Sequence, residues 1–369
     1  MRQHLAVLMF VLATASSAWS QEIVVGQSVA LSGSNADIGR DMRDGALAVF
    51  ARFNAANPIG RRVKLVTLDN ANKRERATEN TQQLLGAQGA LALFGYNSAT
   101  TSIDSLPLAK TANVLFFAPF SGSLVLRSHP NVFTTRASYK DETLKIIEAK
   151  RGMGADKAVI LHYDDEVGRS NYEAAASAYV ETGSAKPPGV AVKRGAKLDA
   201  ASADALLKST AHYVLATTQY GVVSDLLKRA SDKGVTMSIA ALSFVNPDEL
   251  AESVGPLARG TMVSQVIPSP RTANQVAVPL VKECAEELKA LNGSSLNYTS
   301  LESCISATLL VNALKKAGPK VTRESLLQTM GSLGRMDLNG YSLTYSPTDH
   351  RGSSWVELTM LSRGNRFVQ

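Results

Sequence analysis

Residues 22–35, Glu-Ile-Val-Val-Gly-Gln-Ser-Val-Ala-Leu-Ser-Gly-Ser-Asn, form the stretch that decides the fold. Its first half is rich in β-branched side chains, which favours a strand, and the Ser/Gly/Asn cluster at its end favours a turn. From about Asp37, apolar residues recur at intervals of three and four as far as Phe53, which predicts an amphipathic helix that Asn57-Pro58 ends. The chain therefore opens with a strand, a polar loop and a helix.

The residues before this stretch have the features of an export signal. Arg2 gives a positive start, Leu5 to Ala13 form a short apolar run, and Ala18-Trp19-Ser20 puts small residues at the two positions that determine cleavage. A membrane anchor is the alternative, but it needs about 20 apolar residues, roughly twice the length of this run. We therefore expect residues 1–20 to be a signal peptide that is cleaved near Ser20, and the mature protein to be periplasmic.

The alternation of strand and helix continues through two further series of elements. The first series runs to residue 118, and the second runs from 141 to 266. Strands that alternate with helices form parallel sheets with helices on both faces. Residues 272–331 contain three helical segments and no convincing strand, so they must cover a sheet formed earlier. The sequence predicts an α/β fold with two doubly wound parallel sheets.

Composition narrows the classes of function. Hydrophobic residues make up 45% of the 369 residues and charged residues 19%, which is typical of a globular protein, and the length favours two domains. The net charge of +7 is spread thinly, and basic clusters such as Arg61-Arg62-Val63-Lys64 lack interleaved aromatic residues. This pattern favours a solvated basic face over a nucleic-acid surface. The charge supports only a mild preference for anionic small molecules.

Four polar loops follow expected strands, at residues 32–38, 95–101, 119–123 and 162–166. Open parallel sheets bind ligands beyond the carboxyl ends of their strands, where loops run into helix N-termini. Each loop by itself could equally be an ordinary helix cap, since Ser, Thr, Asn and Asp are favoured there whatever the function. The prediction of a binding site rests on several of these loops meeting at one edge.

Enzyme signatures are absent from the sequence. It contains no Gly-x-Ser-x-Gly elbow, no phosphate-binding loop, no His-Glu-x-x-His pair and no complete dinucleotide glycine fingerprint. The histidines after the signal lie far apart, without metal-ligand spacing, and Asp164-Asp165-Glu166 is typical of a solvated helix N-terminus. We therefore predict no catalytic residue, no cofactor and no metal site.

The two cysteines, Cys284 and Cys304, lie on consecutive expected helices. An exported chain permits a disulfide between them, but the bond requires Cα atoms within roughly 7 Å of each other. Sequence alone leaves the bonded and the free states open.

Several short motifs occur together in the order seen in periplasmic receptors of ABC importers. They are Val25 to Gly33, Asp37 to Gly45, Leu93 to Tyr96, Ala118 to Phe120, Arg136 to Tyr139, Leu301 to Ser303 and Asp349 to Gly352. From Glu22 nearly to its end, the chain resembles the branched-chain amino-acid (leucine/isoleucine/valine) binding protein family, the substrate-binding components of these importers.

The resemblance implies the type I periplasmic binding fold. In this fold, two doubly wound parallel-sheet lobes are joined by three hinge crossings and close on a ligand in the cleft between them. The implied first lobe comprises residues 21–137 with 268–347, and the implied second lobe comprises 138–267 with 348–369. The implied partners are a small-molecule ligand and the membrane permease of an importer, and we expect a monomer that does not bind nucleic acid.

The resemblance also places a ligand site on this chain, position by position. Ala99 stands where relatives use a Ser hydroxyl for the α-carboxylate, the late cleft Tyr falls at Cys304, and the acid that holds the α-ammonium falls at Phe244. The ligand-binding residues implied in this way are Asn97, Ser98, Ala99, Thr100, Phe120, Ser121, Gly122, Tyr163, Gln219, Tyr220, Phe244 and Cys304.

Phe244 at the position of the acid changes the expected ligand. An ammonium group buried without a counter-charge costs several kcal/mol, so a carboxylate with an apolar or aromatic body fits this pocket better than an α-amino acid. Glu302 and Asp164 are the acids that could restore the missing charge if they reach the cleft. Two other functions remain as alternatives: a sensory protein that presents its ligand to a receptor kinase, and an exported enzyme.

Overall fold

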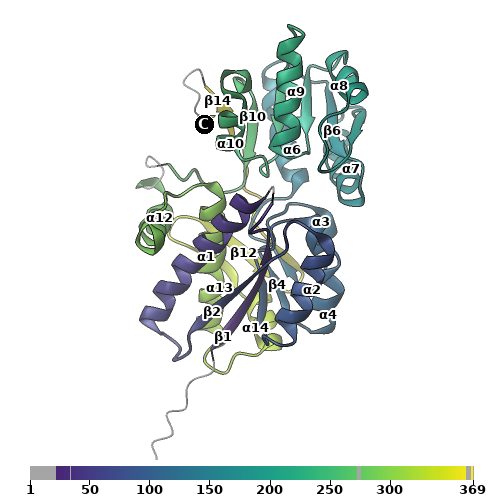
Figure 1. The fold of residues 1–369 in the computed structure, drawn as a ribbon. Coiled ribbons are helices and arrows are strands. Elements are labelled where there is room, and N and C mark those ends of the chain that lie inside the picture. Colours follow the sequence, from purple (N-terminus) through teal and green to yellow (C-terminus); the bar gives the residue numbers. More distant parts are fainter. Residues whose placement is uncertain (1–21, 34, 272–275, 363–366, 369) are drawn as a thin grey trace, which may run out of the picture.

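The computed structural model describes residues 22–33, 35–271, 276–362 and 367–368 (Figure 1). The predicted signal peptide lies outside the described residues. Two α/β lobes are stacked one above the other, and each is built around its own sheet. Among the described residues, none of the helices combines the length and the apolar character that crossing a membrane requires.

The first lobe contains a five-stranded parallel sheet in the order β2-β1-β3-β4-β5. Its strands are β1 (Ile23–Val29), β2 (Val63–Asp69), β3 (Ala92–Phe94), β4 (Leu115–Phe117) and β5 (Val132–Phe133). β1 pairs with both β2 and β3, so the loop that follows it lies at the middle of one sheet edge. β5, a strand of two residues, was not expected from the sequence.

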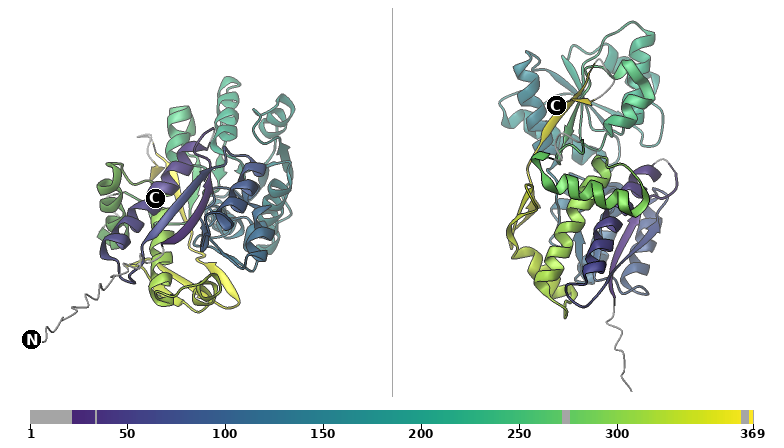
Figure 2. Two further views of the ribbon diagram at one scale, coloured as in Figure 1. Left: turned by 60° about the horizontal axis from the view of Figure 1, so that its bottom comes forward. Right: turned by 90° about the vertical axis from the view of Figure 1, so that its left-hand side faces the viewer.

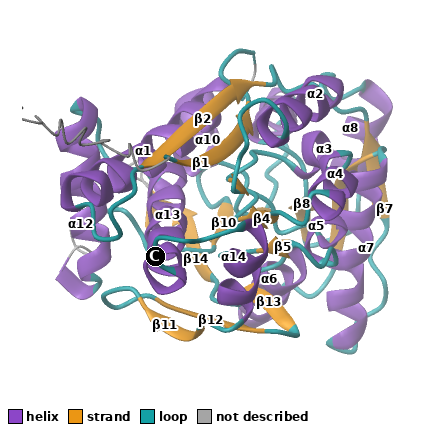
Figure 3. Cartoon of the chain, turned by 90° about the horizontal axis from the view of Figure 1, so that it is seen from below, coloured by secondary structure: helices purple, strands orange, loops and turns teal. Residues whose placement is uncertain are grey.

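Helices cover both faces of this sheet (Figure 3). The N-terminal half supplies α1 (Ala36–Ala56), α2 (Arg74–Leu85), α3 (Ala99–Ser102), α4 (Ser105–Thr111) and α5 (Leu124–Arg127), and the late part of the chain supplies α12 (Pro279–Asn292), α13 (Tyr298–Ala317) and α14 (Arg323–Gly331). The single helix expected at 99–112 is thus two short helices. As predicted, the late helices cover the earlier sheet, because Leu301 and Ile305 share a buried core with Phe50 and Phe94.

Helices α1 and α13 pack closely because Gly45 lies between them. A Cβ atom at Gly45 would lie 2.2 Å from the carbonyl oxygen of Ser300, a separation that side chains do not tolerate. Cys284 of α12 is bonded to Cys304 of α13, with a Cα–Cα distance of 6.0 Å. The bonded state is therefore the one present, and the disulfide joins two helices of the first lobe.

The second lobe contains a seven-stranded sheet in the order β15-β14-β10-β9-β8-β6-β7. The strands are β6 (Ala158–Tyr163), β7 (Gly189–Val192), β8 (Tyr213–Ala216), β9 (Ile239–Ala241), β10 (Met262–Gln265), β14 (Glu357–Leu361) and β15 (Phe367–Val368). The helices are α6 (Tyr139–Gly152), α7 (Glu166–Glu181), α8 (Ala200–Leu207), α9 (Tyr220–Asp232) and α10 (Pro247–Val254), which a 3-10 turn, Gly255–Ala258, follows. β6 to β10 run parallel, and β14 and β15 add an antiparallel edge.

A small antiparallel sheet precedes the last passage of the chain between the lobes (Figure 2). It consists of β11 (Gly334–Asp337), β12 (Ser342–Ser346) and β13 (Asp349–Gly352). The expected boundary between residues 347 and 348 comes before β13, which pairs with β12, and the chain joins the second sheet only at β14. The expected lobe boundaries stay predictions.

Candidate functional site

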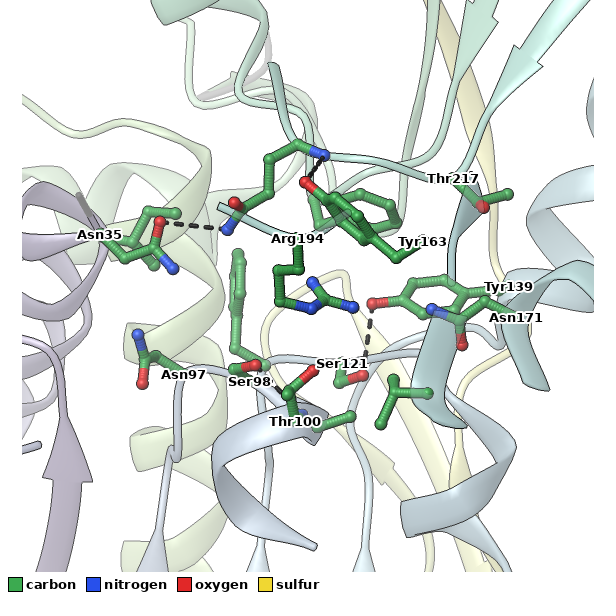
Figure 4. A pocket seen from close by; sticks show the side chains of 16 residues that line it. Asn35, Asn97, Ser98, Thr100, Ser121, Tyr139, Tyr163, Asn171, Arg194 and Thr217 are labelled. Atoms are coloured by element: carbon green, nitrogen blue, oxygen red, sulfur yellow. Dashed lines mark hydrogen bonds between the residues drawn. The ribbon is translucent and has the colours of Figure 1, made fainter. Parts of the chain in front are cut away.

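A cavity of ≈ 60 Å³ lies where the carboxyl ends of the parallel strands of both lobes face each other (Figure 4). Loops that follow β1, β3 and β4 line it from the first lobe, and loops that follow β6, β7, β8 and β9 line it from the second. This is the position at which open parallel sheets bind ligands. Since one water needs about 10–15 Å³ of such space, the cavity holds a molecule of several water-sized groups.

The loop after β3 supplies hydroxyl groups to the floor of the cavity. Ser98 begins α3, and its Oγ accepts a hydrogen bond from the backbone N–H of Thr100 at 3.2 Å. The Ser98 hydroxyl hydrogen remains available to donate to an acceptor in the cavity. Asn97, Ala99 and Thr100 line the same wall, so an oxygen-rich ligand group would meet donors there.

The loop after β4 brings Phe120 and Ser121 to the cavity. Ser121 Oγ lies 3.2 Å from Tyr139 Oη, which fixes both hydroxyls. Gly122 does not line the cavity. A Cβ there would lie 2.7 Å from the Tyr139 ring, so this glycine lets Tyr139 approach from α6 and form part of the wall.

Arg194, which follows β7, reaches into the middle of the cavity (Figure 4). Its guanidinium carbon lies 3.8 Å from the centroid of the Tyr163 ring, at which distance a cation–π attraction holds it. Nε and Nη2 donate to the carboxylate of Asp165 at 2.5 and 3.1 Å. Because these two bonds use one edge of the guanidinium, the N–H groups of Nη1 and the second N–H of Nη2 are left for a ligand.

Asp165 is itself fixed in position, because its carboxylate also accepts from the backbone N–H of Gly168 at 2.7 Å and so caps α7. Burial alone would raise the pKa of Asp165, but the hydrogen bonds from Arg194 and Gly168 lower it below its ordinary value. Asp165 is therefore ionised at neutral pH and holds Arg194 in one orientation. Asp164, one of the acids that could have supplied a counter-charge, is exposed and does not line the cavity.

Direct hydrogen bonds join the two lobes across the cavity. Gln219 Nε2 donates to Asn35 Oδ1 at 3.1 Å, and Ser123 Oγ donates to Asn171 Oδ1 at 2.8 Å. Asn35 directly precedes α1 but does not cap it, so its side chain is free to make this contact. Within the second lobe, the backbone N–H of Gln219 also donates to Tyr163 Oη at 3.2 Å. Because the two side-chain hydrogen bonds cross between the lobes, the structure has the lobes closed on the site.

One charged side chain, Arg194, stands among the sixteen described residues that line the cavity, and none of them is Asp or Glu. The apolar part of the wall comes from Ile38, Phe120, Val167 and Phe244. The described wall therefore combines one cation and several hydroxyl and amide groups with an apolar side.

The structure brings together most of the residues that the resemblance implied. Nine of them line the cavity: Asn97, Ser98, Ala99, Thr100, Phe120, Ser121, Tyr163, Gln219 and Phe244. Tyr220 lines a neighbouring groove that shares Gln219 and Phe244 with it. Cys304 lies outside the site, since it is bonded to Cys284 in the core of the first lobe.

Five polar residues of the wall were not named individually from the sequence, although the first of them lies in the candidate loop 32–38: Asn35, Tyr139, Asn171, Arg194 and Thr217. Arg194 had a usable signal, because it directly follows the strand expected at 189–193 and so stands at a carboxyl strand end. Tyr139 and Asn171 lie inside helices α6 and α7, where no local pattern distinguishes them from core residues.

Comparisons with known proteins cover nearly the whole described chain. A family model described as periplasmic binding protein matches residues 22–365. The crystal structure of a possible leucine/isoleucine/valine-binding protein from Rhodopirellula baltica SH 1 has a TM-score of 0.89 and 27% identity, and the match covers 96% of this chain and 98% of that one. An extracellular ligand-binding receptor from Verminephrobacter eiseniae ef01-2 has a TM-score of 0.85 and 24% identity, with 95% and 100% covered.

A curated protein of Pseudomonas aeruginosa, an amino acid binding protein, is 22% identical over 238 residues. That match covers 63% of this chain and 64% of the relative, which is less than two thirds of the relative's length.

Proposed function

Because this chain belongs to the periplasmic binding protein family, we propose that it binds a small organic anion between its lobes and delivers it to the membrane permease of an ABC importer. The type I fold, with two parallel-sheet lobes, is the one that the family resemblance implied. The proposal concerns the ligand class, the residues that bind it and the partner.

The observation that carries the proposal is the charge of the cavity wall. Arg194 is the one charged residue among the described residues of the wall, and Phe244 occupies the position at which the resemblance expects an acid. A ligand carboxylate therefore finds a guanidinium, whereas an ammonium group beside it finds no carboxylate. A buried unpaired charge costs several kcal/mol, which is enough to decide between these ligand classes.

We place the ligand carboxylate between Arg194 and the hydroxyls of Ser98, Thr100 and Ser121. Arginine presents a planar pair of donors that matches a carboxylate, and such charge-assisted hydrogen bonds are about twice as strong as neutral ones. The apolar body of the ligand then lies against Phe120 and Phe244, both of which line the cavity.

Binding by hinged closure accounts for the contacts between the lobes. The Gln219–Asn35 and Ser123–Asn171 hydrogen bonds can form only when the lobes approach each other. A ligand that touches both walls favours this closed arrangement over an open one, which shifts a population and breaks no covalent bond. We infer that the protein acts as a periplasmic monomer, cleaved near Ser20, and that the closed, loaded form is the one the permease receives.

A ligand screen tests the proposal. Thermal unfolding of the mature protein is measured with aliphatic acids, aromatic acids and amino acids, because a ligand at 100 times its Kd adds about 2.7 kcal/mol to stability. We expect simple carboxylates to raise the Tm and the matching primary amides, which lack the negative charge, to leave it unchanged. If the amides raise the Tm as much as the acids, the proposed anion site is wrong. Turnover of a bound acid would instead favour the alternative of an exported enzyme.

A further inference from the structure

A second, smaller cavity of ≈ 20 Å³ adjoins the first. Ile38, Phe120 and Phe244 line both cavities, so the small one lies directly behind the apolar wall of the large one. Its volume corresponds to about one water-sized group, since one water needs about 10–15 Å³. A hydroxyl or a primary ammonium at the end of a ligand has this size.

Glu302 of α13 lines the small cavity. Its side chain is almost entirely buried, with 6% of the residue's surface exposed. Its charged partner is Arg136, whose Nε lies 3.5 Å from Oε1, too far for a good hydrogen bond. Among the described residues, Nε and Nη1 of Arg136 have no hydrogen-bond acceptor. No hydrogen bond from the described part of the chain reaches the carboxylate of Glu302, so its oxygens keep acceptor capacity.

A second buried carboxylate, Glu142 of α6, faces the same guanidinium but is fully hydrogen-bonded. Its oxygens accept from the Ser243 backbone N–H at 2.7 Å, from Ser243 Oγ at 3.0 Å and from Ser264 Oγ at 2.6 Å. Nη2 of Arg136 donates to the same Ser243 Oγ, so Arg136 is linked to Glu142 through Ser243 and paired with Glu302. With both carboxyl groups ionised, the cluster has one negative charge in excess, and Glu302 is the member that lines a cavity.

The electrostatics of Glu302 agree with a missing partner. Burial and the nearby charge of Glu142 raise its pKa, the charge of Arg136 lowers it, and the result is a pKa of about 7. An additional cation in the small cavity would stabilise the ionised form, because an opposite charge within a few ångströms favours ionisation.

We propose that the small cavity is a second subsite, in which Glu302 accepts hydrogen bonds from a primary ammonium at the far end of the ligand. This inference rests on the proposed function and names its substrate class: an ω-amino acid. Its carboxylate meets Arg194, its apolar stem lies along Phe120 and Phe244, and its ammonium meets Glu302. If the ligand is an α-amino acid instead, its ammonium group stays in the large cavity beside the carboxylate, away from Glu302.

Calorimetry on the wild-type protein tests this subsite without any mutation. The ligands are straight-chain acids of four to six carbons, each compared with its ω-amino and its α-amino derivative, at about pH 8, where Glu302 is ionised. We expect one ω-amino acid of the series to bind about tenfold more tightly than its parent acid, from one added hydrogen bond to a charged group. Parent acids that bind as tightly as every ω-amino derivative would overturn the subsite alone, whereas no binding by any acid would overturn the proposed function.

The variant Glu302→Gln assigns the effect to one side chain. We expect the ratio of the ω-amino acid's affinity to the parent acid's to fall to about one, while the affinity for the parent acid changes little. Glu142→Gln is the matched control, because it removes a buried carboxylate from the same Arg136 without facing the cavity, and it should keep most of the preference. Loss of preference in Glu142→Gln and its retention in Glu302→Gln would overturn the assignment. If neither variant folds, the wild-type series still decides.

Discussion

At the scale of single residues, the proposed preference for anions rests on Arg194. Its guanidinium carbon lies 3.8 Å from the centroid of the Tyr163 ring, and its N–H groups pair with the carboxylate of Asp165. Tyr163 ends β6 and Asp165 follows it, whereas Arg194 follows β7, so the pairing of these neighbouring strands brings the three together. A guanidinium held in this way loses little further freedom when it binds a carboxylate.

Arg194→Met tests this role directly. The substitution keeps an apolar side chain of similar length over Tyr163 and removes the positive charge. We expect the affinity for a simple acid to fall by about 1.5–3 kcal/mol, the contribution of a hydrogen bond to a charged group. Arg169→Met serves as the control, since Arg169 is exposed on α7 and does not line the cavity. Equal affinities of wild type and Arg194→Met would show that another group binds the anion.

At the scale of elements, α13 connects the core of the first lobe to the site. It packs against α1 at Gly45, it is bonded to α12 through Cys304, and it carries Glu302 to the small cavity. Because a helix turns by 100° per residue, two residues apart point to nearly opposite sides. One face of α13 therefore stabilises the lobe, while the other lines the small cavity.

The disulfide should stabilise the first lobe without acting on the ligand. It closes a loop with a sequence separation of 20, for which the chain-entropy estimate is about 3 kcal/mol. We expect Cys284→Ser/Cys304→Ser to lower the free energy of unfolding in urea by roughly that amount, with the affinity of the folded protein unchanged. An altered affinity with unchanged stability would indicate that Cys304 acts in the site.

Local sequence patterns predict some features of this structure and not others. The strand–loop–helix alternation follows from local periodicity, so the two sheets and the covering role of the late helices were predicted correctly. Cys304 was assigned to the cleft because alignment to within about one residue is not enough on a helix, where one residue is 100°. Arg194 was missed although it follows an expected strand, because its contacts with Tyr163 and Asp165 join segments about 30 residues apart in the sequence.

At the scale of the whole molecule, closure brings acids of the two lobes together. Glu249 of α10 lies in the second lobe, and Asp37 and Asp41 of α1 lie in the first. Burial and, to a smaller degree, the charges of Asp37 and Asp41 raise the pKa of Glu249 to about 7. Repulsion between these groups opposes closure when Glu249 is ionised.

This arrangement predicts a pH dependence of ligand binding. The pKa of Glu249 is about 7 in the closed form and lower in the open form, where Asp37 and Asp41 lie farther away, so the cost of its charge to closure grows as the pH rises from the ordinary carboxyl range to about 7 and is constant above it. We expect the affinity for a simple acid to fall between pH 5 and pH 7. Glu249→Gln should bind more tightly than wild type at pH 8, and the difference should shrink at pH 5, as measured by calorimetry. A wild-type affinity that rises over this range, or a variant with the same pH profile, would contradict this.

The central claim is that the cleft binds a carboxylate and has no partner for an α-ammonium group. Calorimetry with leucine against 4-methylpentanoate, and with phenylalanine against phenylpropanoate, tests it most directly, because each pair differs only in that group. The charge of the cavity wall predicts that the acids without the amino group bind more tightly, since the buried ammonium would be unpaired. Micromolar or tighter binding of leucine or phenylalanine, with no binding of the matching acid, would contradict the account.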